Sequence, residues 1–164
     1  MQTIVHPDGT TYRGEVNSNG QYHGYGSLTK TNADKYVGEW QNGHFHGHGI
    51  LTEANGTKHI SEWKNDVRHG YGMILYPSGI KYIGEFQDGH CYGEGCWTYP
   101  DGTRYNGQYQ GRAVLDGRGI AIYPNGSSYA GQWQAGNPHG HGTWTYADGT
   151  IRTGQWENGR SSNT

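Results

Sequence analysis

Apolar and polar residues alternate in short runs along the whole chain. The segment 36–40 (YVGEW) places Tyr36, Gly38 and Trp40 on one face of an extended strand, because successive side chains of a strand point to opposite faces. A second kind of run, such as 47–51 (GHGIL), places its two glycines and a leucine on one face. No segment shows apolar residues at helical spacing, so we predict almost no helix. The pattern predicts an all-β chain.

These two runs recur at a fixed period. The first run begins at Tyr12, Tyr36, His59, Tyr82, Tyr105, Tyr129 and Arg152, so successive starts lie 24, 23, 23, 23, 24 and 23 residues apart. Turn dipeptides such as Asn42-Gly43 follow the first run, and segments such as 100–103 (PDGT) follow the second. Each repeat is therefore predicted to be a β-hairpin. We expect the extra residue of the two 24-residue repeats to lie in a loop, where insertions are tolerated.

The period also predicts how the chain is organised. Tandem hairpins of this kind should form an elongated, single-layer, twisted antiparallel sheet of about 14 strands. We assign one array to residues 1–160 and a disordered tail to residues 161–164. The array consists of a half repeat at 1–11, full repeats that begin near residues 12, 36, 59, 82, 105 and 129, and a half repeat at 152–160.

Composition indicates how a single layer could be stabilised. Hydrophobic residues make up only 31% of the chain, which alone suggests disorder, but there are 6 Trp, 14 Tyr, 2 Phe and 30 Gly. A lone sheet has no second layer to cover it. We therefore expect the Tyr and Trp rings to lie flat on the bare backbone of the glycines. Burial of ring surface, at about 25 cal/mol per Å², should be the main stabilising term.

The repeated motifs resemble the MORN-repeat family (membrane occupation and recognition nexus), whose unit runs roughly Y-x-G-x-W-x-x-G-x-x-x-G-x-G. The resemblance covers nearly the whole chain. His59, Ser61 and Asp66 depart from it in the third repeat, Arg152 replaces the last tyrosine, and Ala33 replaces a turn glycine. We expect local strain or looser packing at these positions. The resemblance implies a scaffold of cytoskeletal, junctional or ciliary assemblies, or a targeting module beside an enzyme.

A non-catalytic scaffold or adaptor is the function that we favour. An aromatic-lined groove would receive a segment of a partner protein, with Trp and Tyr side chains as anchors. The residues predicted to line this groove are Tyr36, Trp40, Trp63, Tyr82, Phe86, Trp97, Tyr99, Tyr105, Tyr109, Tyr129, Trp133 and Trp144.

The other face of the predicted sheet changes in character along the chain. The fourth position of the first run is Glu in four repeats and Gln in the later ones. Apolar residues on this face are either sheltered by sheet twist or covered, by a second copy of the chain, which would make a homodimer, or by a partner. The residues of this self-association face are Val37, Ile60, Met73, Leu75, Ile83, Ile120 and Ile122. Cys91 and Cys96 are expected to be free thiols.

Histidines mostly follow the repeat register. Residues of one column recur about 10 Å apart, which is too far to share a metal ion. Only His44, His46 and His48 are spaced to chelate along one strand, and no Cys, Asp or Glu is clustered with them in the sequence. We expect these histidines to be structural or solvent-facing, and we predict no metal and no cofactor.

The net charge and the remaining sequence features decide between the other classes of function. The net charge is −2 and the basic residues are scattered, which argues against a nucleic-acid partner. A membrane- or phosphoinositide-associated module is the first alternative, implied by the family name, although the lysines are isolated. A small-molecule or nucleotide sponge is the second alternative. No catalytic motif stands out from the repeat, so we predict no enzyme. The sequence shows neither a signal peptide nor an apolar run that could span a bilayer, so we expect a cytoplasmic protein.

Overall fold

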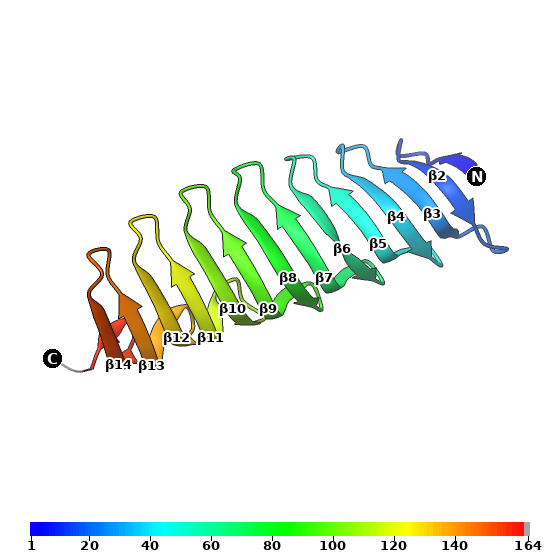
Figure 1. Ribbon diagram of the computed structural model, residues 1–164. Helices are drawn as coiled ribbons and strands as arrows, with labels where there is room; N and C mark the ends of the chain where they lie inside the picture. The colour runs from blue at the N-terminus through cyan, green and yellow to red at the C-terminus, as the bar shows by residue number, and fades with distance from the viewer. Residues whose placement is uncertain (163–164) are drawn as a thin grey trace. The chain divides into compact units, whose positions relative to one another are not determined.

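The computed structural model describes residues 1–162, and within this range the chain is all-β without a helix. In these residues, fifteen strands follow one another in a single open antiparallel sheet, each paired with its neighbours in the sequence (Figure 1). The strands are β1 (Gln2–Val5), β2 (Thr11–Val16), β3 (Tyr22–Thr29), β4 (Lys35–Gln41), β5 (His44–Thr52), β6 (Lys58–Lys64), β7 (Val67–Leu75), β8 (Lys81–Gln87), β9 (His90–Thr98), β10 (Arg104–Gln110), β11 (Leu115–Ile122), β12 (Ser128–Gln134), β13 (Asn137–Thr145), β14 (Ile151–Glu157) and β15 (Arg160–Ser161).

The C-terminal end of the sheet differs from the expectation of about 14 strands and a tail from residue 161. A turn at Asn158-Gly159, with both residues at positive φ, folds the chain back after β14. Ser161 in β15 then pairs with Trp156 in β14. Ser161 is therefore part of the sheet, and residues 163–164 lie outside the described residues.

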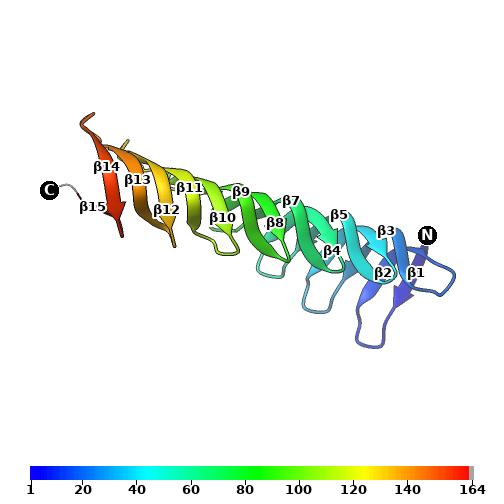
Figure 2. The same cartoon turned by 90° about the horizontal axis from the view of Figure 1, so that it is seen from below.

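The chain divides into two compact units. The N-terminal unit consists of Met1–Pro77 and Phe86–Gly89, and the C-terminal unit consists of Ser78–Glu85 and the chain from His90 onward. The sequence pattern predicted one array without this division. Within each unit the strands lie side by side in one layer (Figure 2).

The two kinds of loop hold the hairpins in register. Asn42 and Gly43 have φ of 52° and 89°, as the tight turns favoured in hairpins require. In the other loops a side chain closes the turn: Asp8 Oδ1 accepts a hydrogen bond of 2.9 Å from the Thr10 N–H. Asn55, Asp101, Asn125 and Asp148 make the same contact two residues ahead. Ala33 occupies a glycine position at φ 73°, where a non-glycine residue is strained, as predicted.

A β-bulge lies beside the glycine pair in the first, second, third, fifth and sixth full repeats. Between Gly38 and Trp40 the register of β4 and β5 shifts, and Gly47 adopts a left-handed φ of 55°. Glu39 Oε1 accepts a hydrogen bond of 2.9 Å from the His48 N–H across this bulge. Gln132 makes the equivalent contact with the His141 N–H at 2.7 Å. Glu and Gln both supply this acceptor oxygen, which explains why one can replace the other along the chain.

The expected packing of rings on glycines is confirmed. Tyr36 is almost fully buried, and a Cβ added to Gly49 would lie 2.6 Å or less from its Cε2, Cζ and hydroxyl oxygen. The Tyr36 hydroxyl donates a hydrogen bond of 2.9 Å to the Glu39 carbonyl. Tyr12, Tyr82 and Tyr129 donate to the carbonyl three residues ahead in the same way. A side chain on Gly49, or on Gly38 opposite it, would meet the Tyr36 side chain, so these two glycines form a seat for the ring.

Tryptophans connect successive repeats. Trp40 Nε1 donates a hydrogen bond of 3.2 Å to the carbonyl of Gly26, a glycine of the preceding repeat. Trp63, Trp133 and Trp156 make the same contact with Gly49, Gly119 and Gly142 at 3.0, 3.0 and 3.1 Å. Because the indole N–H is satisfied, these rings can be buried at little polar cost.

A third set of side chains covers the tyrosines and was missed by the sequence interpretation. Tyr22 stacks on Tyr12 and Phe45 stacks on Tyr36, each with ring centroids 3.7 Å apart. The equivalent positions in the later repeats are Arg68, Cys91, Leu115 and Pro138. This column carries no common residue type, so the sequence alone did not mark it as part of the core.

Candidate functional site

Most residues of the predicted aromatic groove belong to the core. Nine of the twelve are buried: Tyr36, Trp40, Trp63, Tyr82, Phe86, Trp97, Tyr109, Tyr129 and Trp133. Tyr99, Tyr105 and Trp144 are partly exposed. The aromatic face is therefore largely closed by its own packing, which corrects the expectation of an open groove. The contact of these residues with a partner stays a prediction.

In the fifth repeat a tyrosine is displaced from its glycine seat. A Cβ on Gly119 would meet the methyl groups of Leu115 at 2.9 and 3.0 Å, whereas the matching glycines of neighbouring repeats meet a tyrosine ring. Leu115 is fully buried and Tyr105 is only partly buried. The Tyr109 hydroxyl donates a hydrogen bond of 2.7 Å to the Tyr105 carbonyl. Leu115 thus fills the seat, and the Tyr105 ring is left near the surface.

A pocket of about 180 Å³ opens beside this displaced ring, within the C-terminal unit. Its lining comprises Tyr99, Tyr105, Ala113, Val114, Leu115, Trp133 and Gly136. Ala113 and Val114 come from the loop between β10 and β11, which belongs to a 24-residue repeat. The extra residue was expected in this loop. Here the longer loop supplies one wall of an apolar pocket.

A row of partly exposed rings continues from the pocket across the C-terminal unit. Ring centroids are 6.0 Å apart for Tyr99 and Tyr105, 6.2 Å for Tyr105 and Tyr123, and 5.6 Å for Tyr123 and Trp144. Tyr146 follows Trp144 at 6.1 Å and is 37% exposed. We call these five residues the aromatic row. Burial raises the pKa of Tyr123 to about 12.

The predicted groove included neither Tyr123 nor Tyr146. Both lie four residues after the second glycine of a pair, as does Tyr99. This shared column was the signal that could have identified them.

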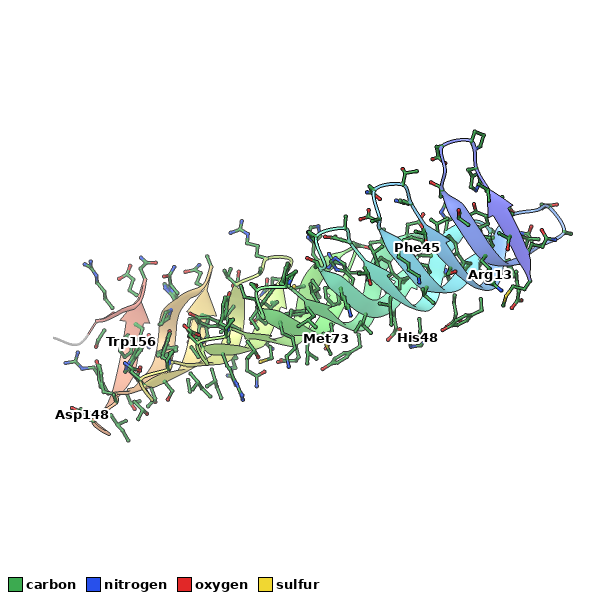
Figure 3. The ribbon with its side chains drawn as sticks, turned by 90° about the horizontal axis from the view of Figure 1, so that it is seen from above. Arg13, Phe45, His48, Met73, Asp148 and Trp156 are labelled. Carbon is green, nitrogen blue, oxygen red and sulfur yellow. The ribbon has the colours of Figure 1, made fainter. Side chains whose placement is uncertain are left out.

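The outer face of the sheet, opposite the buried rings, carries the residues of the predicted self-association face. Val37, Ile60, Leu75, Ile120 and Ile122 are exposed there, and Met73 and Ile83 are partly exposed. In the N-terminal unit, Figure 3 shows Met73 and His48 on the side of the sheet away from Phe45. Ile50 is exposed as well and was not included in the prediction.

The three closely spaced histidines have different surroundings. His44 Nδ1 lies 2.6 Å from Asp66 Oδ2, and His48 Nδ1 lies 3.5 Å from Glu39 Oε1. His46 Nδ1 is buried without a hydrogen-bond partner. Among residues 1–162, no three His, Cys, Asp or Glu side chains are gathered closely enough to hold a metal ion. Neither Cys91 nor Cys96 is part of a disulfide.

The departures of the third repeat create a polar network in place of a seated tyrosine. His59 is buried, and its Nδ1 lies 3.0 Å from an Arg68 guanidinium nitrogen. Because a guanidinium only donates, this Nδ1 accepts, and the Nε2–H donates to Glu53 Oε1 at 2.9 Å. Arg68 also lies 5.0 Å from the centre of the Phe86 ring. The Ser61 hydroxyl, which replaces a glycine, is buried without a partner.

This network should make stability depend on pH. Desolvation lowers the pKa of His59 below its ordinary value of 6.5, and Arg68 adds to the effect. The unfolded chain then binds a proton more readily, so the free energy of unfolding should fall as pH drops below 6.5 and through the folded-state pKa. Urea unfolding between pH 7.5 and 5 measures this change. The His59→Tyr variant should show a smaller decrease than the wild type; an equal decrease would assign the effect to other groups.

Comparison with known proteins places the repeats in a family. The family model described as MORN repeat matches residues 12–35, 36–58, 59–81, 82–104, 112–128 and 129–151. No curated protein matched the sequence. Within the described residues, no helix is long and apolar enough to cross a bilayer.

Several solved structures share the fold. The SAS-4 (dCPAP) TCP domain of Drosophila melanogaster, solved with a proline-rich motif of Ana2 (dSTIL), has a TM-score of 0.55 at 14% identity and covers 94% of this chain and 83% of its own. A mutant TCP10 domain of Danio rerio CPAP has a TM-score of 0.54 at 19% identity, covering 94% and 73%. The TCP10c domain of Drosophila melanogaster Sas-4 has a TM-score of 0.52 at 15% identity, covering 94% and 91%.

Proposed function

The chain belongs to the MORN-repeat family, and we propose that it is a non-catalytic protein-interaction module that holds an extended segment of another protein against the aromatic row. The observation that carries this proposal is the fifth repeat. There, Leu115 takes the glycine seat, Tyr105 is displaced toward the surface, and a pocket opens beside it. Partly exposed rings next to a preformed apolar pocket are typical anchor sites for a partner side chain.

The dimensions of the pocket favour a side chain over a whole ligand. Its volume of about 180 Å³ is smaller than the roughly 300–1,000 Å³ of most small-molecule sites. A proline or leucine side chain suits a space walled by Val114, Leu115 and the rings of Tyr99 and Tyr105. The neighbouring rings of the row would then lie against the residues that follow in the segment.

Proline-containing segments suit this surface best. A polyproline II segment is already extended and loses little conformational entropy on binding, and aromatic surfaces are its usual receptors. The Drosophila TCP domain, which shares the fold, was solved with a proline-rich motif. This likeness supports an extended segment as the partner chemistry.

Selection from a display library of proline-containing peptides, followed by calorimetric titration of the selected peptides, tests the proposal. Tyr105→Ala should weaken binding at least about tenfold, since it removes one wall of the pocket and one anchor ring. Tyr71→Ala is the matched control, because Tyr71 is 58% exposed and lies in the N-terminal unit. Failure to select any binding peptide, or equal losses in both variants, would contradict the proposal.

A further inference from the structure

Four apolar side chains form a continuous cross-strand row on the outer face of the N-terminal unit. Val37 on β4 is paired with Ile50 on β5, Ile50 with Ile60 on β6, and Ile60 with Met73 on β7. Val37, Ile50 and Ile60 are 36, 42 and 39% exposed, and Met73 is partly exposed. Residues directly opposite on a sheet face lie about 5 Å apart, so the four side chains touch in sequence. We call them the apolar strip.

The strip is a local feature and not a property of the repeat. On β2 and β3 the same row holds Arg13 and Ser27, which pair with each other. In the C-terminal unit Ile120 occupies the row, but its neighbours are Asn106 and Ala130. Sheets that face water usually carry polar residues on that side. An unbroken exposed apolar row therefore indicates a surface that is covered in the working protein.

Charges border the strip on both sides with opposite sign. Lys35 precedes Val37 by two residues on β4, and Glu39 follows it by two. Lys58 and Glu62 are placed in the same way around Ile60 on β6. Because alternate residues share a face, both strands present a lysine, an apolar residue and a glutamate, in that order, on the outer face. Glu39 and Glu62 are held in place by the N–H groups of His48 and Tyr71, at 2.9 and 3.2 Å.

We propose that the apolar strip is an interface with a second copy of the chain, related by a two-fold axis that runs along the strip. This axis places the lysine row of each copy against the glutamate row of the other, and the strip against itself. A two-fold axis parallel to the strands would oppose lysine to lysine and glutamate to glutamate. The charge pattern thus favours the first arrangement, in which the same patch is buried on both copies.

This inference does not depend on the proposed function. The strip lies on the outer face of the N-terminal unit, whereas the pocket belongs to the aromatic side of the C-terminal unit. Tyr105→Ala should therefore leave the association state unchanged. Failure of either idea leaves the other in place.

Sedimentation equilibrium on the full chain tests the interface. The wild type should dimerise with a dissociation constant of roughly 1–100 μM. Replacing two strip residues in Ile50→Thr/Ile60→Thr keeps the β-branched shape and should raise that constant roughly a hundredfold. The matched control is Ile120→Thr/Ile122→Thr, which changes two isoleucines that are each 45% exposed on the outer face but outside the strip. It should dimerise like the wild type.

A charge reversal tests the direction of the axis. In each copy, Lys58→Glu places a glutamate against Glu62 of the other copy. This repulsion should weaken the dimer roughly fivefold. Adding Glu62→Gln relieves that repulsion and retains the acceptor for the Tyr71 N–H, so the double variant should recover most of the loss. A wild type that is monomeric up to about 500 μM, or a dimer insensitive to the strip variant, would overturn the inference. The inference would also be overturned if the protein were monomeric and the strip variant lost binding to a different protein.

Discussion

Replacing Trp40 with alanine should lower the free energy of unfolding by about 4 kcal/mol, which is the middle of the range for buried aromatic residues. Trp40 is buried and lies edge-on to Tyr12, Tyr36 and Phe45, with centroid distances of 5.4, 5.1 and 4.9 Å. Its removal opens a cavity between two repeats and leaves the Gly26 carbonyl without its indole donor. A single-layer sheet has no second layer that could close the gap.

Urea denaturation followed by circular dichroism measures this loss. Trp40→Phe separates its two parts, because it keeps an aromatic ring and removes the donor; it should cost about 1–2 kcal/mol. Phe86 occupies the equivalent position in the fourth repeat, so a phenylalanine is compatible with the fold. Tyr25→Ala, at a residue 57% exposed on the outer face, should change stability by less than about 0.5 kcal/mol. Equal losses for Trp40→Ala and Tyr25→Ala would contradict the assignment of Trp40 to the core.

The regular part of this fold could be predicted because the same residue pattern, which has the same physical cause, recurs in each repeat. The alternation of Tyr36, Gly38 and Trp40 fixed strand direction and face, and the Asn42-Gly43 dipeptide fixed the turn. In a lone sheet, glycine opposite an aromatic residue indicates that the ring lies on the bare glycine backbone, and the tyrosine seats confirm this packing. The short β15 was missed because a two-residue strand has no periodicity to detect.

The irregular part could not be predicted, because it depends on which of several neighbouring side chains packs against the glycines. The column that covers the tyrosines contains aromatic, aliphatic, cationic, thiol and proline residues, so no composition rule identifies it. In the fifth repeat, Leu115 from that column displaces Tyr105 from the glycine seat. The sequence shows both residues and the longer loop, yet the pocket appears only when their packing is resolved in three dimensions. The candidate site arises where the repeat deviates.

Replacing Gly49 with alanine should cost about 3 kcal/mol, because overpacking a filled core costs about 1–3 kcal/mol and this site has no room to relax. The added Cβ would lie 2.6 Å from a Tyr36 ring carbon, below any normal contact distance. Gly49 also faces Gly38 across the strand pair, and its carbonyl accepts the Trp63 indole N–H at 3.0 Å. Ring, backbone and indole would all have to shift together.

A double-mutant cycle with Tyr36→Ala isolates the contact between ring and glycine. If the seat explains the cost, Gly49→Ala should be nearly neutral once the Tyr36 ring is gone, which corresponds to a coupling energy of about 3 kcal/mol between the two sites. Gly20→Ala serves as the comparison, since a Cβ there meets nothing within 4 Å and only the positive φ of 75° opposes it; it should cost about 1 kcal/mol. Additive losses in the cycle would show that the glycine serves backbone conformation alone. The aromatic face would then owe its order to something other than rings resting on bare backbone.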